Sequence, residues 1–240
     1  MKKKHPIRKA VCIIAVLLLC SAVAVGAFFG IKGYMLYRDA ISQTPITEKV
    51  DELRGDKHFT KYADLPDFYI EAVISVEDHR FKTHPGIDVI AIGRAAWTDL
   101  KTMSFKEGGS TITQQLAKNL LFTQAKSIER KAAEVFAAFD MESRYSKEEI
   151  FELYVNTVYF GSGYYGIYTA SKGYFDKLPS ELTDYEAAML AGLPNAPSAY
   201  SPDTNAELAA RRVDAVLRSM VRHKLLTEEE AEQIRNSADG

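Results

Sequence analysis

The sequence predicts a mostly α-helical domain of roughly 190 residues behind a single N-terminal transmembrane helix. Three observations lead to this class. Residues 10–31 are apolar or small throughout and carry no charge. Much of the remaining chain repeats apolar residues with the 3.6-residue period of an α-helix, and capping sequences precede several of these segments. We find no convincing run with the two-residue alternation of a strand, no internal repeat and no low-complexity segment.

The apolar run at 10–31 is long enough to cross a bilayer. At about 1.5 Å per residue it spans the hydrocarbon core of about 30 Å. A cleaved signal peptide is the competing interpretation, but its apolar region is usually about 7–15 residues long and ends in a small-x-small cleavage site. Here the run leads into Lys32, Tyr34, Tyr37 and Arg38, which suit a membrane interface. We therefore expect an uncleaved anchor.

The charges around the run predict its orientation. The basic residues that precede it are Lys2, Lys3, Lys4, Arg8 and Lys9, with no acidic residue among them. Because positive flanks remain in the cytoplasm, the N-terminus is expected there and the rest outside, in a single-pass cell-membrane protein. We divide the chain into a cytoplasmic tail (1–9), an anchor (10–32), a connector (33–65) and an extracytoplasmic domain (66–240).

The composition argues against several classes of function. The formal net charge is −2, which gives no signal for nucleic acid. Both cysteines, Cys12 and Cys20, lie in the apolar run. On a helix they are about 12 Å apart, beyond the ~7 Å Cα limit for a disulfide. The outer domain therefore has no cysteine nucleophile, disulfide or cysteine-based metal site.

The helices are expected in a definite order. The connector holds a short helix or two, Pro66 opens a helix that continues over 70–81, and Pro85-Gly86 ends this region. Later helices are expected at 87–101, 112–121, about 126–144 and about 205–223. Capping sequences predict three more helices: one from 147 after Ser146-x-x-Glu149, one that ends at 192 after Thr183-x-x-Glu186, and one after Thr227-x-x-Glu230. Thr111-x-x-Gln114 is the capping box of the helix at 112–121.

Glu77 lies on the apolar side of its predicted helix, in the stripe formed by Ile70, Val73, Ile74 and Phe81. A buried carboxylate is costly unless it is paired or protonated. Two interpretations follow. Glu77 is either a core residue held by partners, or a general acid or base whose pKa is raised by an apolar surround.

Other polar clusters also allow two interpretations. In the helix at about 126–144, the predicted buried stripe consists of Ile128, Ala132, Val135, Phe136 and Phe139. Arg130 and Glu134 lie off that stripe, either as a solvated ion pair or, with Lys131, along an anion-binding cleft. Gly108-Gly109-Ser110-Thr111 precedes a helix N-terminus, which suits pyrophosphate but is also an ordinary helix start. His79 and His84 do not indicate a two-histidine metal site, whereas Asp78 could hold an oxygen-ligated ion.

Five motifs taken together resemble one family. They are Glu77–Gly86 (E-D-x-x-F-x-x-H-x-G), Gly109–Gln115 (G-S-T-I-T-Q-Q), Arg130–Glu134 (R-K-x-x-E), Lys147–Gly161 and Glu186–Pro197. In this order, over about residues 66–202, they resemble the peptidoglycan glycosyltransferases, the transglycosylase domains of penicillin-binding proteins. The resemblance implies a lysozyme-like fold and polymerisation of lipid II into β-1,4-linked glycan with release of undecaprenyl diphosphate. Because 240 residues leave no room for a transpeptidase, we expect a monofunctional enzyme.

The resemblance also implies roles for single residues. Glu77 is the expected general base for the 4-hydroxyl of the acceptor sugar, and Glu134 is the second essential acid. The expected pyrophosphate ligands are Arg80, Ser110, Thr111, Lys118, Arg130 and Lys131. Gln114, Gln115 and Asn156 are expected to bind sugar or support the cleft, and Asp78 to hold Mg²⁺ or Mn²⁺. Ile92, Trp97, Met103 and Phe105 are expected to enter lipid, with a core position as the alternative for Trp97.

The expected partners are lipid II, the growing glycan strand, the cytoplasmic membrane and cell-wall synthesis proteins. Two other functions are compatible with parts of the pattern. A lytic enzyme of the same architecture would cleave glycan with an acidic residue, but it does not explain the pyrophosphate-binding motifs. A catalytically silent anchored scaffold would explain the amphipathic helices but not the acid at Glu77.

Overall fold

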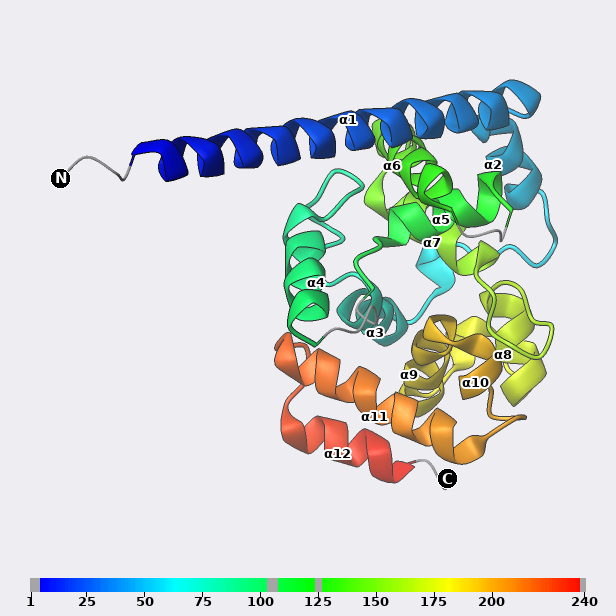
Figure 1. Ribbon diagram of the computed structural model, residues 1–240. Helices are drawn as coiled ribbons and strands as arrows, with labels where there is room; N and C mark the ends of the chain where they lie inside the picture. The colour runs from blue at the N-terminus through cyan, green and yellow to red at the C-terminus, as the bar shows by residue number, and fades with distance from the viewer. Residues whose placement is uncertain (1–4, 103–107, 124–126, 238–240) are drawn as a thin grey trace.

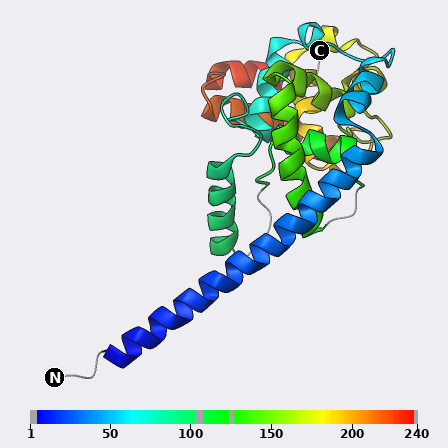
Figure 2. The same cartoon turned by 90° about the horizontal axis from the view of Figure 1, so that it is seen from above.

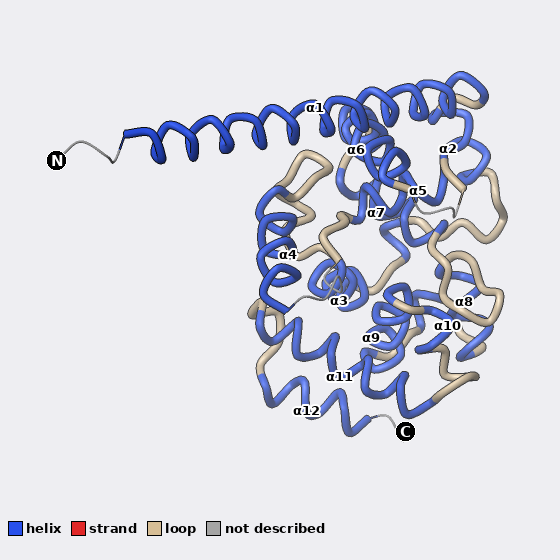
Figure 3. Tube along the Cα trace, viewed as in Figure 1, coloured by secondary structure: helices blue, strands red, loops and turns tan. Residues whose placement is uncertain are grey.

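The computed structural model describes residues 5–102, 108–123 and 127–237, and these are mostly helical, with loops between the helices (Figures 1 and 3). The helices are α1 (His5–Gln43), α2 (Ile46–Arg54), α3 (Asp67–Glu77), α4 (Val89–Thr102), α5 (Ile112–Leu121), α6 (Ile128–Arg144), α7 (Lys147–Thr157), α8 (Ile167–Phe175), α9 (Asp184–Gly192), α10 (Pro197–Tyr200), α11 (Ala206–Arg222) and α12 (Glu228–Asn236). Three short 3₁₀ helices join them. The described residues contain no strand, only one isolated bridge between Tyr159 and Tyr165. The predicted mostly α class behind one long apolar helix is confirmed.

The first helix is longer than the predicted anchor. It continues without a break to Gln43, so the first part of the predicted connector is helical. Its N-terminal half projects away from the other helices, and its apolar side chains there are exposed (Figure 2). Its length and composition are those of a membrane-spanning helix. The C-terminal part of α1 instead packs along α6 (Figure 1).

The α4 helix forms a second projection. Figure 2 shows it leaving the domain on the same side as the exposed half of α1. Val89, Ile90 and Trp97 on this helix are each at least 60% exposed, and Lys101 lies over the Trp97 ring. The core position considered for Trp97 is therefore wrong. The predicted lipid-facing residues Met103 and Phe105 lie outside the described residues.

The core is built around α3, α5, α7, α9 and α11. Its largest fully buried side chains include Tyr69 of α3, Leu116 of α5 and Tyr154 of α7. The four capping boxes that the sequence predicts before α5, α7, α9 and α12 are all present. Each fixes the start of one helix, so these helices present the expected residues to the core.

Two helices differ from the expectation. The α3 helix ends at Glu77 and not at Phe81, because Asp78 has an extended backbone (φ −159°) and its side chain turns towards α5. In α6 the predicted stripe is wrong. The side chains facing the core are those of Ala133, Glu134, Ala137, Ala138 and Met141. Part of the predicted stripe faces α1 instead, because that helix covers the opposite side of α6.

Candidate active site

Glu77 occupies the last position of α3, where its carboxylate is buried but incompletely paired. Its side chain is 9% exposed. Gln115 Nε2 donates to Glu77 Oε2 over 2.8 Å, and Arg212 Nη2 lies 3.9 Å from Oε1. Within the described part of the chain, Glu77 Oε1 has no hydrogen-bond partner. An acceptor oxygen left in this state is costly, so the arrangement is unusual for a residue with a purely structural role.

The surroundings of Glu77 favour its protonated form. Burial is the main cause that raises the pKa of its carboxyl, and the hydrogen bond from Gln115 and the charges of Arg212 and Lys118 oppose it only in part. Tyr69 and Tyr154 are fully buried near Glu77 and have raised pKa values themselves, mainly because of burial. Glu77 therefore has the raised pKa that a general base near neutral pH requires.

Asp78, the next residue, is satisfied by the protein. Its oxygens lie 2.9 and 3.0 Å from Nε2 of His84, and it accepts the backbone N–H of Ile112 at the start of α5 over 3.0 Å. Thr111 Oγ1 donates to the carbonyl of Gly86 and completes the junction. The described residues contain no group of three or more metal-ligating side chains. The contacts of Asp78 with His84 and Ile112 give it a structural role, and its role as a metal ligand stays a prediction.

Glu134 forms the centre of a cationic group. Its side chain is 3% exposed, Lys131 Nζ donates to Oε2 over 2.9 Å, and Arg130 Nε lies 3.0 Å from Oε1. The interpretation of Arg130 and Glu134 as a solvated pair is wrong, because α5 and α1 cover α6 from two sides. Lys131 also donates to Ser110 Oγ over 2.5 Å. This contact brings the second and third motifs together.

Lys118 on α5 connects the two acidic residues. It is half-buried, and burial is the main cause that lowers its pKa. The carboxylates of Glu134 and Glu77 both oppose that shift, while Arg130 and Lys131 reinforce it. The carboxylate of Glu134 is thus the counter-charge of Arg130 and Lys131 in direct contact, and of Lys118 through longer-range attraction. We call Lys118, Arg130, Lys131 and Glu134 the cationic group. Its net positive charge suits an anionic ligand.

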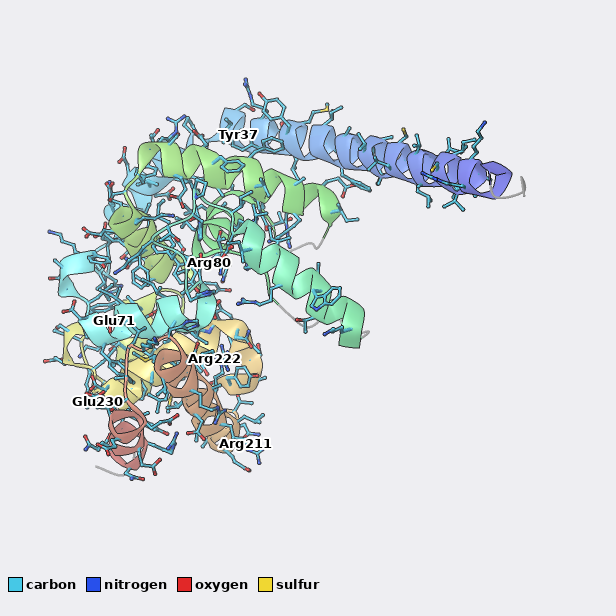
Figure 4. All side chains as sticks on the ribbon, turned by 90° about the vertical axis from the view of Figure 1, so that its left-hand side faces the viewer. Tyr37, Glu71, Arg80, Arg211, Arg222 and Glu230 are labelled. Atoms are coloured by element: carbon cyan, nitrogen blue, oxygen red, sulfur yellow. The ribbon has the colours of Figure 1, made fainter. Side chains whose placement is uncertain are left out.

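Other predicted site residues have structural contacts. Arg80 pairs with Asp88 over 2.7 Å and lines a separate cavity of about 280 Å³ with His79 and His223. Figure 4 shows Arg80 close to the start of α4. The side chain of Gln114 is buried and closes the capping box with Thr111.

The amide of Asn156 is similarly occupied. It binds the backbone N–H and carbonyl of Thr60 and the carbonyl of Glu152. These contacts hold the connector against α7, and they leave the Asn156 amide committed to the protein and not to a sugar.

Two residues near Glu77 were missed from the sequence. Arg212 donates from Nε to the carbonyl of Gly192 and directs Nη2 towards Glu77. It lies three residues after buried Ala209 and four before buried Val216, so a charge within an apolar stripe could have identified it. Tyr154 places its hydroxyl 3.5 Å from Gln115 Oε1, on the far side of the amide that binds Glu77.

Known proteins are similar to most of this chain. A family model described as transglycosylase matches residues 43–221. Penicillin-binding protein 1A of Neisseria gonorrhoeae is 44% identical over 180 residues, which cover 75% of this chain and 23% of that protein. Penicillin-binding protein 1F of Bacillus subtilis is 42% identical over 183 residues, 72% of this chain and 26% of that protein. A crystal structure of penicillin-binding protein 1A from Haemophilus influenzae is similar at 24% identity and a TM-score of 0.44, covering 74% of this chain and 17% of that one. The chain spans about a quarter of the length of these curated relatives.

Proposed function

Because the chain belongs to the transglycosylase family of the penicillin-binding-protein type, we propose that it polymerises lipid II into β-1,4-linked glycan and releases undecaprenyl diphosphate. One observation carries this proposal. A buried carboxylate with an unpartnered oxygen, Glu77, lies beside Lys118, which belongs to the cationic group. The reaction needs both parts, a base for the acceptor hydroxyl and positive charge for the departing diphosphate.

Glu77 is the proposed general base. Its free oxygen, Oε1, accepts the proton of the 4-hydroxyl of the acceptor sugar as that oxygen attacks the anomeric carbon of the donor. The bond from this carbon to the diphosphate breaks, and the electron pair leaves with the diphosphate. A single displacement converts the α-linked donor into a β-1,4 bond. Base catalysis of this kind contributes about 10²–10⁴-fold and works best with a pKa near the ambient pH, which burial of Glu77 favours.

The cationic group is the proposed diphosphate site. Negative charge grows on the leaving oxygen, and fixed cations stabilise it without reorganisation. Lys131 also donates a hydrogen bond to Ser110, so the proposed diphosphate site extends to the G-S-T-I-T-Q-Q segment. The N-terminus of α5 contributes less than the sequence suggested, because Asp78 already accepts the N–H of Ile112. The geometry therefore supports side-chain cations more than helix N–H groups as diphosphate ligands.

The exposed apolar half of α1 and the apolar face of α4 support an anchored enzyme that acts at a membrane surface. We propose that the N-terminus is cytoplasmic and the other helices lie outside, on the evidence of the basic residues before the anchor. A divalent ion that accompanies the diphosphate is also a proposal, and the oxygens of Asp78 that would hold it also contact His84.

The decisive experiment is incubation of the full chain with purified lipid II in lipid vesicles, with and without a metal chelator. Gel analysis detects glycan polymer, and chromatography detects undecaprenyl diphosphate. We expect both products from the wild type, and we expect Glu77→Gln to form them about 10²–10⁴-fold more slowly. Cleavage of purified sacculi without any polymer from lipid II would instead identify a lytic enzyme and overturn the proposal.

A further inference from the structure

The α1 helix touches α6 at a position where only glycine fits. A Cβ atom placed on Gly33 would lie 2.4 Å from Cβ of Ala132 and 2.9 Å from the backbone nitrogen of Ala133. Both distances are shorter than real Cβ contacts, and backbone atoms cannot move aside as a flexible side chain can. Gly26 and Gly30 of the same helix have no atom of the described residues within 4 Å of such a Cβ. Close packing is therefore specific to Gly33.

A second contact fixes the same two helices one turn further on. Tyr37 is buried and donates from its hydroxyl to Asp140 Oδ2 over 2.7 Å. Asp140 is also held by Arg144, over 2.7 Å. The rings of Tyr34 and Tyr37 lie 5.3 and 6.4 Å from that of Phe136. Figure 4 shows Tyr37 where α1 passes along α6. The contact thus extends over about one turn of α1 and about two turns of α6, so α1 is held in a fixed place on α6.

The Gly33 contact falls within the cationic group. Ala132 and Ala133 directly follow Lys131 and directly precede Glu134. Lys131 is tied to Ser110 and Glu134 is buried between its cations. A shift of the α6 backbone at Ala132 would therefore move Lys131 and Glu134 together.

The same contact lies at the end of the apolar run. Ile31 is the last residue of that run, Lys32 is the first charge after it, and Gly33 follows. One residue of helix is about 1.5 Å, so the Gly33 contact begins within a few ångströms of the expected membrane surface. A lipid-linked diphosphate would present its charge at this level.

We propose that α1 is a positioning element as well as an anchor, and that Gly33 sets the height and register of the cationic group at the membrane surface. This proposal rests on the proposed function. Gly33 is a positioning residue, because it acts through α6 and touches no substrate atom. The ligand that it helps to place is the diphosphate of a lipid-linked sugar.

The test compares Gly33→Leu with Gly30→Leu in the full chain, at varied lipid II content in vesicles. Both changes add the same side chain to the same helix, one against α6 and one in open space. Because misplacement by about 1 Å can cost up to about 10²-fold, we expect KM for lipid II to rise about tenfold or more in Gly33→Leu, with a smaller change in kcat. Gly30→Leu is expected to stay within about twofold of the wild type in both constants.

A rescue experiment separates positioning from general destabilisation. Gly33→Ala creates the short contact with Ala132, and Ala132→Gly in the same protein removes the shortest part of it. Glycine within a helix lowers stability, so loss of stability alone would make the double variant worse. We expect instead that KM is lower in the double variant than in Gly33→Ala, and closer to the wild-type value. Equal KM values for Gly33→Leu and Gly30→Leu, or absence of rescue, would overturn this proposal alone. Absence of polymer from the wild type would overturn the proposed function and this proposal with it.

Discussion

Glu77 and Glu134 are both buried carboxylates, but their surroundings differ in kind. Glu134 has two cations at 2.9–3.0 Å, and a third, Lys118, is close enough to be influenced by it. Glu77 has one amide donor, a guanidinium at 3.9 Å and one oxygen with no hydrogen-bond partner among the described residues. The difference indicates separate tasks. Glu134 Oε1 also lacks a hydrogen bond among the described residues, but Arg130 Nε lies 3.0 Å from it, whereas Arg212 Nη2 lies 3.9 Å from Glu77 Oε1. A carboxylate in close contact with two cations holds them in place, whereas one with only a more distant cation retains an oxygen that can accept a proton.

Because their surroundings differ, the two acids are also expected to differ in how much their removal lowers the stability of the fold. Removing one partner from a buried ion pair leaves an uncompensated charge, which typically costs about 3–5 kcal/mol. Neutralising Glu77 instead removes a group that is already costly to bury. We therefore expect changes at Glu134 to lower stability and substrate binding, and changes at Glu77 to lower the rate of reaction without loss of stability.

The largest expected effect is that of Glu77→Gln on the rate. Glutamine keeps the shape of the side chain but cannot accept the proton, so kcat should fall by about 10²–10⁴-fold. KM for lipid II should stay within a few fold, because the cationic group is unchanged. Steady-state kinetics with purified lipid II measures both constants. Near-normal turnover by a folded Glu77→Gln protein would contradict the assignment of the base.

The second effect is that of Glu134→Gln on binding and stability. Loss of this carboxylate leaves Lys118, Arg130 and Lys131 without their shared counter-charge. We expect a loss of stability of about 3–5 kcal/mol and a raised KM. We also expect a smaller increase in Tm on adding undecaprenyl diphosphate than in the wild type, because cations that Glu134 no longer holds in place bind the diphosphate less tightly.

The matched control for Glu134→Gln is Glu129→Gln, which changes a partly exposed acid in the first turn of the same helix. Its Tm and its response to the ligand should match those of the wild type. If both variants behaved alike, Glu134 would have no special place among the acids of α6.

Much of the scaffold could be predicted from the sequence, and the reason is local. A capping box is complete within four residues, so the starts of α5, α7, α9 and α12 follow from the chain alone. The burial of Glu77 could also be predicted from the sequence, because its spacing within an apolar stripe is a local property.

The remainder depends on contacts between distant segments. The buried face of α6 could not be deduced from periodicity, because α1 covers the side that the pattern assigned to the core and small alanines face α5. The end of α3 was misplaced for a similar reason. Asp78 leaves the helix to bind Ile112, which lies 34 residues away. Separate roles for neighbouring acids such as Glu77 and Asp78 appear only when these partners are known.

A smaller effect is expected from Arg212→Gln, which removes the guanidinium nearest Glu77. A cation favours the charged form of a carboxyl, so its loss should raise the pKa of Glu77 further. The acidic limb of the pH–rate profile should then move to higher pH, with little change on the alkaline side of that limb. Arg211→Gln is the control, since Arg211 pairs with Glu207 at the surface (Figure 4). An unshifted limb in Arg212→Gln would show that Arg212 does not tune the base.

The smallest expected effect is a pH-dependent difference in stability between Glu77→Gln and the wild type. The pKa of Glu77 is raised in the folded state above its usual value of 4.5. Between the unfolded and folded pKa values, the folded wild type therefore binds a proton that the unfolded chain has lost. Its free energy of unfolding falls as the pH rises through this window, whereas Glu77→Gln has no such proton. Chemical denaturation from pH 4 upwards should thus show Glu77→Gln gaining stability relative to the wild type as the pH increases. The substitution also alters the hydrogen bond from Gln115, which shifts the stability by a constant amount. The comparison therefore rests on the slope of stability with pH and not on the offset. A relative slope of the opposite sign would mean that the partners of Glu77 lower its pKa in the folded state, and this would contradict its assignment as the base.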